Sequence, residues 1–262
     1  MAHLTARGSY EDLTTRINRY PQGAPPSELL YRILGMLFSE REAELVAKLP
    51  IRPFGAEQAA KIWGVGIAEA ETILQQLAER ALLVDMEMVG RMEYVLPPPM
   101  AGFFEFALMR VRDDINQKLL SELYEQYITV EEDFIKALFV AGDTQLGRMF
   151  VQESVLSSDQ SLHVLDFERA TEVIETASDI GIGMCYCRHK KQHQGTACDA
   201  EMDICMTFNM VAESLNRHGV TRRVDKVECK ELLHKAWEQN LAQFGENVQP
   251  VSYTHLRAHE TL

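Results

Sequence analysis

The sequence predicts an α+β fold that is predominantly α-helical, and three observations support this prediction. Apolar residues recur at helical spacing along most of the chain, whereas two short segments alternate apolar and acidic residues as strands do. Five cysteines are too few for a disulfide-stapled fold, but four of them fall within 21 residues, which indicates metal binding or redox chemistry. With 262 residues, the chain is long enough for two or three compact units.

Residues 1–26 are expected to form an N-terminal arm rather than a domain. They hold one short amphipathic stretch, Tyr10–Tyr20, and end in PQGAPP, a Pro- and Gly-rich sequence that stops a helix. The next helix is predicted to run to Leu49. Its start is marked by a capping box, in which the side chains of Ser39 and Glu42 each accept a hydrogen bond from an otherwise unpaired backbone N–H.

A helix–turn–helix and a β-hairpin are predicted next. Residues 55–63 and Ile67–Ala81 have helical periodicity on either side of the turn Gly64–Gly66. Leu82–Met88 and Met92–Leu96 then alternate as the two strands of a hairpin. The second helix is expected to bury its apolar residues, which are Ile67, Ala70, Ile73, Leu74, Leu77 and Ala81.

This order of elements, with the sequence FGAEQAAKIWGVG, resembles the winged-helix family over residues 27–97. The resemblance implies a winged-helix domain at residues 27–100. A helix–turn–helix suggests DNA binding, but residues 66–81 carry Glu69, Glu71 and Glu79 against Arg80 alone, a net charge of −2. Because a recognition helix normally brings basic or amide side chains to phosphates and base edges, we expect protein docking rather than nucleic-acid binding.

The overall composition excludes several classes of protein. The chain is 46% hydrophobic and 25% charged, as in ordinary globular proteins. It has no apolar run near the roughly 18–20 residues that span a membrane, and its first residues lack a signal-peptide core. We therefore expect a cytoplasmic protein with no membrane partner. Its 26 basic and 39 acidic residues give a net charge of −13, which further disfavours nucleic acid as a partner.

A helical middle region is predicted at residues 101–165. Its helical pattern is clear over residues 102–140, and extended pieces such as Met149–Val155 follow. A Cys-rich module is predicted at residues 166–250. It opens with a helix at Phe167–Ser178, and the turn signal Gly181-Ile182-Gly183 ends this helix just before the cysteines.

The cysteines form a C-x-C-x10-C-x6-C array made of Cys185, Cys187, Cys198 and Cys205. On an extended strand the first two would point the same way, because side chains alternate along a strand. Ile204, Phe208, Val211 and Leu215 mark one helix face, so Cys205 is expected near the start of a helix, where the dipole favours a thiolate.

The spacing of these thiols leaves two kinds of metal site open. Four thiolates on one zinc ion, at ~2.3 Å each, require the chain to turn sharply between Cys198 and Cys205. An iron–sulfur cluster is wider and also takes four thiolates. The C-x-C start departs from the cysteine spacings usual in structural zinc sites and in ferredoxin clusters alike. Residues 181–198 carry three basic and no acidic residues, which would offset the charge of either site, although Asp199, Glu201 and Asp203 follow.

The run CYCRHKK…C…CMTF, after a helix and a Gly-rich turn, resembles bacterial 4Fe-4S ferredoxin-type iron–sulfur proteins with an N-terminal winged-helix domain. The likeness covers residues 10–250, including PQGAPPS and LAQFGEN. It implies that Cys185, Cys187, Cys198 and Cys205 are ligands of a 4Fe-4S cluster. The implied function is that of an electron-transfer protein or the oxidoreductase component of an enzyme. The implied partners are a redox protein and, in a homo-oligomer, further copies of the chain. The alternatives are a redox- or iron-sensing winged-helix regulator and a structural zinc-binding protein.

The remaining candidates predict no catalytic residue. Cys229 lies in a helix opened by Asp225 and shares its apolar stripe with Leu233, Trp237 and Leu241, which predicts a buried structural thiol. His189 and His193 are spaced to share a zinc ion if their segment is helical, but the polar surroundings favour solvated loop histidines. The chain has no P-loop, G-x-S-x-G, H-E-x-x-H or G-x-G-x-x-G motif.

Residues 251–262 are expected to be a non-native tail. The helix carrying Leu233, Trp237 and Leu241 is predicted to end near Phe244-Gly245, and the sequence VSYTHLRAHETL then abandons its pattern. This tail resembles translated adapter sequence, and such segments are left out of fold reasoning. We expect it to pack loosely, and we expect the natural chain to continue past Gln249 into further Cys-rich sequence, which makes the Cys-rich module incomplete here.

Overall fold

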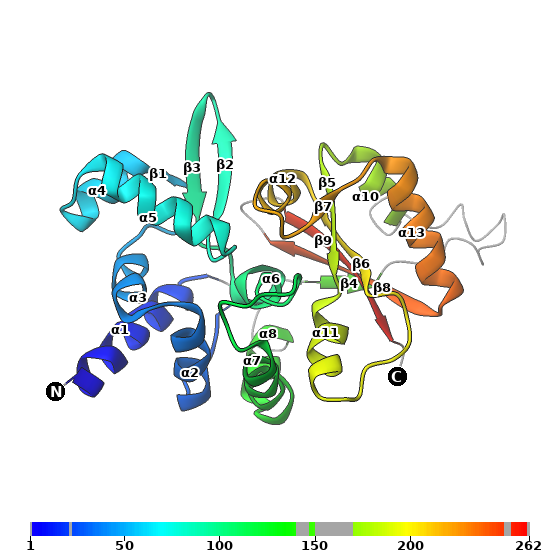
Figure 1. Ribbon diagram of the computed structural model, residues 1–262, viewed down its shortest axis with the longest axis horizontal. Helices are drawn as coiled ribbons and strands as arrows, with labels where there is room; N and C mark the ends of the chain where they lie inside the picture. Colours follow the sequence, from blue (N-terminus) through cyan, green and yellow to red (C-terminus); the bar gives the residue numbers. More distant parts are fainter. Residues whose placement is uncertain (1, 21–22, 140–146, 150–169, 249–252, 261–262) are drawn as a thin grey trace. The chain divides into compact units, whose positions relative to one another are not determined.

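The computed structural model describes the whole chain except residues 1, 21–22, 140–146, 150–169, 249–252 and 261–262 (Figure 1). It is a mixed α+β protein, mostly helical, with two antiparallel sheets, as the sequence predicts at this coarse level. The chain divides into two compact units. Unit 1 comprises residues 1–107, 111–144 and 193–195, and unit 2 comprises the remainder. None of the described helices is long and apolar enough to cross a membrane.

Unit 1 is built mainly of helices around a small sheet. Strands β1, β3 and β2 lie in that order and pair antiparallel. Its elements in chain order are α1 (Ala2–Ile17), α2 (Glu28–Leu37), α3 (Glu40–Ala47), β1 (Phe54–Gly55), α4 (Ala56–Trp63), α5 (Ile67–Glu79), β2 (Val84–Met88), β3 (Arg91–Val95), the π-helical turn η1 (Pro99–Phe103), α6 (Phe104–Phe106), α7 (Gln117–Tyr124), the π-helical turn η2 (Glu125–Val130) and α8 (Asp133–Phe139).

The first 26 residues contribute to the core of unit 1. Helix α1 packs against α3, and Leu13 and Ile17 are fully buried. The Tyr20 hydroxyl donates a hydrogen bond to the carbonyl of Leu96 at 2.6 Å. The segment expected to be a separate arm is therefore held against the rest of unit 1 by apolar burial and polar contacts.

The local signals in residues 39–96 predict the observed elements closely. Ser39 and Glu42 form the capping box of α3, and the two helices and the hairpin that follow are all present. Gly64 ends α4 in the left-handed conformation, with φ +70°. The predicted burial of α5 is wrong at Ile67, which is 51% exposed because the first turn of the helix projects beyond the core.

The middle region is less regular than predicted. The helical pattern of residues 102–140 is interrupted between α6 and α7, and η1 has non-helical backbone at Met100, Ala101 and Gly102. An aromatic cluster forms the core here: Phe104 packs against Tyr124, Tyr127 and Phe134. Apart from Met149 at the end of β4, the predicted extended piece 149–155 lies outside the described residues.

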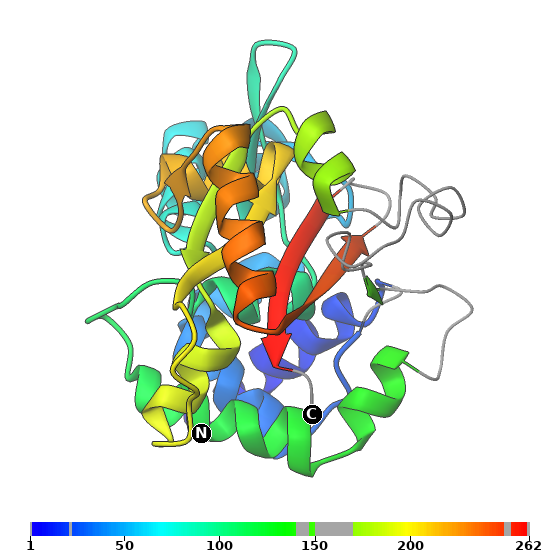
Figure 2. The same cartoon turned by 90° about the vertical axis from the view of Figure 1, so that its right-hand side faces the viewer.

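Unit 2 is a six-stranded antiparallel sheet with the strand order β4-β8-β9-β6-β5-β7. Helices α10 and α13 pack on it, and Figure 2 shows α13 lying across the strands. Its elements are β4 (Gly147–Met149), α10 (Ala170–Thr176), β5 (Ile180–Met184), α11 (Tyr186–His193), β6 (Asp203–Phe208), α12 (Asn209–Arg217), β7 (Arg222–Arg223), α13 (Lys226–Glu238), β8 (Leu241–Val248) and β9 (Tyr253–Glu260).

Three predictions for unit 2 are wrong. Gly181 and Gly183 lie in strand β5 rather than in a turn. Helix α13 ends at Glu238, and Leu241 begins strand β8, because Asn240 adopts a left-handed conformation, with φ +57°, that reverses the chain. The tail does not hang loosely: residues 253–260 form β9, whose backbone pairs with both β8 and β6.

Candidate functional site

The candidate site of unit 2 begins where strand β5 meets helix α11. Cys185 is the residue between them, 1% exposed, and its backbone N–H donates to the carbonyl of Met202 at 2.7 Å. It occupies the N-cap position of α11, and its sulfur accepts a hydrogen bond from the backbone N–H of Arg188. The sulfur therefore takes the place of the oxygen that normally caps a helix, at the positive end of the helix dipole.

Cys187 and Cys205 reach the same point from two different elements. Cys187 lies in the first turn of α11, and Cys205 lies on β6, opposite Gly183 of β5. Both thiols donate hydrogen bonds to the sulfur of Cys185. The structure thus brings three of the four predicted cysteines together, but not in the predicted elements: Cys187 is helical rather than extended, and Cys205 is on a strand rather than near the start of a helix.

The three thiols differ in pKa because Cys185 accepts hydrogen bonds, whereas Cys187 and Cys205 donate them. The hydrogen bonds from Cys187 and Cys205, helped by the Arg188 charge, hold the pKa of Cys185 well below its usual range despite its burial. Donation to Cys185 and burial raise the pKa values of Cys187 and Cys205 well above the usual range. Cys185 is thus the most acidic thiol of the three.

Buried basic residues lie beside this group. Arg188, His189 and Lys190 are all buried on α11, and Arg188 donates a hydrogen bond to the carbonyl of Glu201. His189 is not a solvated loop residue: it is 4% exposed and its Nδ1 lies 2.8 Å from the carbonyl oxygen of Leu108. The sequence signal for this environment was the absence of acidic residues from 181–198, but that signal did not reveal that the cations are buried.

Cys198 lies in the loop between α11 and β6 and is half-buried. The thiols of Cys185, Cys187 and Cys205 do not take their pKa shifts from it. Within the described part of the chain, no three or more Cys, His, Asp or Glu side chains surround a point where a single ion would sit. Cys185 is thus hydrogen-bonded to both Cys187 and Cys205, and the fourth predicted ligand, Cys198, lies in the connecting loop.

The fifth cysteine stands apart from this group. Cys229 is completely buried on α13, and its thiol donates to the sulfur of Met206 at 3.7 Å. Burial raises the pKa of Cys229 to about 12, so the thiol is neutral. The prediction of a buried structural thiol is confirmed.

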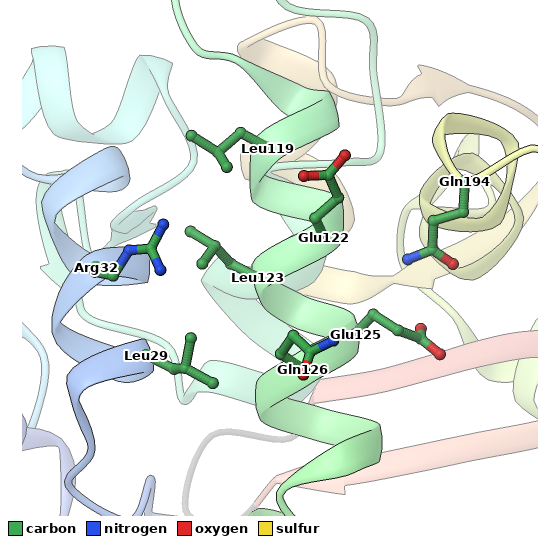
Figure 3. A pocket seen from close by; sticks show the side chains of 8 residues that line it. All are labelled: Leu29, Arg32, Leu119, Glu122, Leu123, Glu125, Gln126 and Gln194. Carbon is green, nitrogen blue, oxygen red and sulfur yellow. The ribbon is translucent and has the colours of Figure 1, made fainter.

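Unit 1 has a cavity of its own between α2 and the helical segment α7–η2, with a volume of about 460 Å³ (Figure 3). Leu29 on α2 and Leu119 and Leu123 on α7 face the space between these helices, whereas Glu122 and Glu125 point to the side where Gln194 lies. The lining has neither cysteine nor histidine, so this cavity offers no soft metal ligands.

Comparison of the chain with protein-family models, with curated proteins and with solved structures finds no match.

Proposed function

We propose that unit 2 binds an iron–sulfur cluster of the 4Fe-4S type and serves in electron transfer, as a redox protein or a redox-enzyme subunit. The observation that carries this proposal is the convergence of Cys185, Cys187 and Cys205 from a helix N-terminus and a neighbouring strand. Cys198, seven residues before Cys205, is the fourth ligand candidate. Thiolates are the ligands that iron–sulfur clusters take.

The residues around the thiols fit such a group. The donor set contains only sulfur, which favours iron–sulfur clusters and zinc over hard cations. The charge of Arg188 favours the ionised form of Cys185, and both Arg188 and Lys190 are buried next to the thiols. Positive charge fixed in a low-dielectric region offsets the negative charge of a thiolate-ligated centre.

Each side chain has a defined part in this proposal. Cys185 supplies the first thiolate, because the backbone N–H of Arg188 and the dipole of α11 already stabilise its charge. Cys187 and Cys205 would hold the cluster as thiolates, and the protons lost on ligation would pass to solvent. The backbone N–H of Arg188 would remain a hydrogen-bond donor to sulfur, the kind of contact that tunes the reduction potential of a cluster. When bound, the cluster would supply one-electron transfer.

Anaerobic purification and reconstitution test the proposal. The protein should contain iron and labile sulfide and absorb as a brown iron–sulfur protein. Cys187→Ser should reduce both iron and sulfide sharply, whereas Cys229→Ser, the matched control at the separate buried thiol, should leave them unchanged. Stoichiometric zinc without sulfide would contradict the proposal and favour a structural zinc site instead.

A second candidate function is supported by unit 1. The order β1-α4-α5-β2-β3, with β1 paired to β3, is the order of a winged-helix domain. The tip of its hairpin exposes Met88, Val89 and Met92 to solvent. We infer that this winged helix docks a protein partner. The alternative is a redox- or iron-sensing regulator in which the cluster controls the winged helix. Crosslinking from Val89→Cys, with Val111→Cys as the exposed control, tests the docking surface, and equal capture of proteins at the two positions would contradict it.

A further inference from the structure

A second cavity in unit 1 lies between helices α1 and α3 and has a volume of about 260 Å³. This is just below the roughly 300–1,000 Å³ of pockets that hold drug-sized ligands, so it suits a small ligand. Its lining is largely charged and consists of Asp12, Thr15, Arg16, Arg19, Glu44, Ala47 and Lys48.

Arg16 is a buried cation in the wall of this cavity. Its side chain is 2% exposed, and its Nε and Nη2 donate to the carbonyls of Leu49 and Pro50 at 3.3 and 2.6 Å. The guanidinium carbon lies 5.2 Å from the ring centroid of Tyr20. The third nitrogen, Nη1, is buried without a hydrogen-bond partner, and no carboxylate among the described residues pairs with Arg16.

This arrangement leaves a buried charge incompletely compensated. Buried guanidinium groups normally have a counter-charge, because removing a charge from water is costly. The carbonyls of Leu49 and Pro50 carry only partial negative charge. An anion in the adjacent cavity would supply the missing charge.

The rim of the cavity adds further donors. Lys48 and Glu44 form an ion pair at 2.7 Å and neutralise each other, while Arg19 and Asp12 are exposed. The lining therefore carries three cations and two carboxylates, a net charge of +1. The exposed guanidinium of Arg19 lines the cavity and favours an anion there, whereas the carboxylate of Asp12 opposes one.

We propose that this cavity is a binding site for a small oxyanion, a phosphate or carboxylate group. Arg19 and Lys48 donate hydrogen bonds to it at the rim, and Arg16 supplies the fixed positive charge beneath. A guanidinium group can donate two parallel hydrogen bonds to the oxygens of either a phosphate or a carboxylate, so the same residues could bind either anion.

Isothermal titration of the full chain with inorganic phosphate and, separately, with acetate tests this site. Arg19→Gln should raise the Kd about tenfold, equivalent to about 1.4 kcal/mol, and Asp12→Asn should lower it because a like charge is removed. Both residues are exposed, so neither substitution threatens folding. Arg32→Gln, an exposed arginine on α2 outside the cavity, is the matched control and should have no effect.

The two anions identify the ligand group. Tighter binding of phosphate supports a phosphate group, and tighter binding of acetate supports a carboxylate group. A Kd weaker than about 10 mM for both anions would overturn the proposal. Equal losses in Arg19→Gln and Arg32→Gln would overturn it as well, because such binding would follow net charge rather than the cavity.

Discussion

The thiol of Cys229 shows how burial, together with the nearby charge of Glu228, sets the ionisation of a side chain. Its pKa is raised to about 12 in the folded chain, from an ordinary value near 9. Above pH 9 the unfolded thiol loses its proton while the folded thiol keeps it, so the unfolded state binds fewer protons and stability falls. The free energy of unfolding should decline through this group by about 1.4 kcal/mol per pH unit between pH 9 and 12.

Urea unfolding of the protein and of Cys229→Ala between pH 8 and 10.5 measures the contribution of Cys229 to this decline in the free energy of unfolding. The variant should lose about 1 kcal/mol at pH 8 from reduced packing, and its decline above pH 9 should be shallower than that of the parent protein. Parallel declines in the two proteins would show that Cys229 does not titrate as its burial requires.

Single residues also mark the limit of what the sequence predicts. The sequence predicted one group of four cysteines, and the structure brings Cys185, Cys187 and Cys205 together while Cys198 lies in the connecting loop. Cys205 joins the other two because β6 pairs with β5, which the spacing alone did not reveal. Glycine was less informative. A Cβ on Gly181 would come within 2.5 Å of the Thr221 Oγ1, so this glycine allows close packing within a strand, whereas its sequence context suggested a turn. The sequence around Gly181 could not show this close packing, because the contacting residue, Thr221, lies 40 positions further along the chain.

At the scale of elements, locally determined features were predicted and pairing-dependent ones were not. The α3 capping box and the α4–α5 turn depend on neighbouring residues alone. Residues 203–208 depend on partners in β5 and β9. Ile204 and Phe208 fit a helix at a spacing of four, yet Ile204, Met206 and Phe208 fit a strand at a spacing of two, so the apolar pattern alone did not separate the two.

The turn between α4 and α5 gives a prediction at this scale, because its two glycines have different conformations. Gly64 has φ +70°, and Gly66 has φ −69° and caps α5 without a side-chain hydrogen bond. Gly64→Ala should lower the free energy of unfolding by about 1–2 kcal/mol, since alanine is strained in the left-handed region. Gly66→Ser should raise it by about 0.5 kcal/mol by supplying a capping oxygen.

Both positions are open to solvent, with no atom within 4 Å of a new Cβ, so packing does not complicate the comparison. Thermal and urea unfolding of the two variants measure the difference. Equal effects at Gly64 and Gly66 would contradict the assignment of the left-handed cap.

At the scale of unit 2, the sheet requires β9, which lies between β8 and β6. Deleting residues 251–262 should expose the backbone groups of β6 that pair with it, at Met206 and Thr207. Amide hydrogen exchange in β6 should then accelerate at least about tenfold, while α3 in unit 1 keeps its protection and serves as the internal control. Unchanged exchange in β6 would instead support the loosely packed, non-native tail that the sequence suggests.

For the molecule as a whole, charge decides whether the proposed winged helix of unit 1 binds DNA. The whole chain has a net charge of −13, and the exposed face of α5 is also acidic because it carries Glu69, Glu71 and Glu79. The nearby cations are engaged: Arg41 lies 3.8 Å from Glu69, and Arg80 pairs with Glu42. Phosphate contacts that release counterions are the main source of DNA affinity, and this face offers none.

Duplex DNA should therefore not bind with sub-micromolar affinity at near-physiological salt, as measured by fluorescence anisotropy. A double variant, Glu69→Lys with Glu71→Lys, reverses the charge of this face by four and should create weak binding that falls steeply with salt, because lysines would then release counterions. Salt-sensitive, sub-micromolar binding by the unaltered chain would establish a DNA-binding surface elsewhere in the molecule and would favour the regulator over the electron-transfer protein.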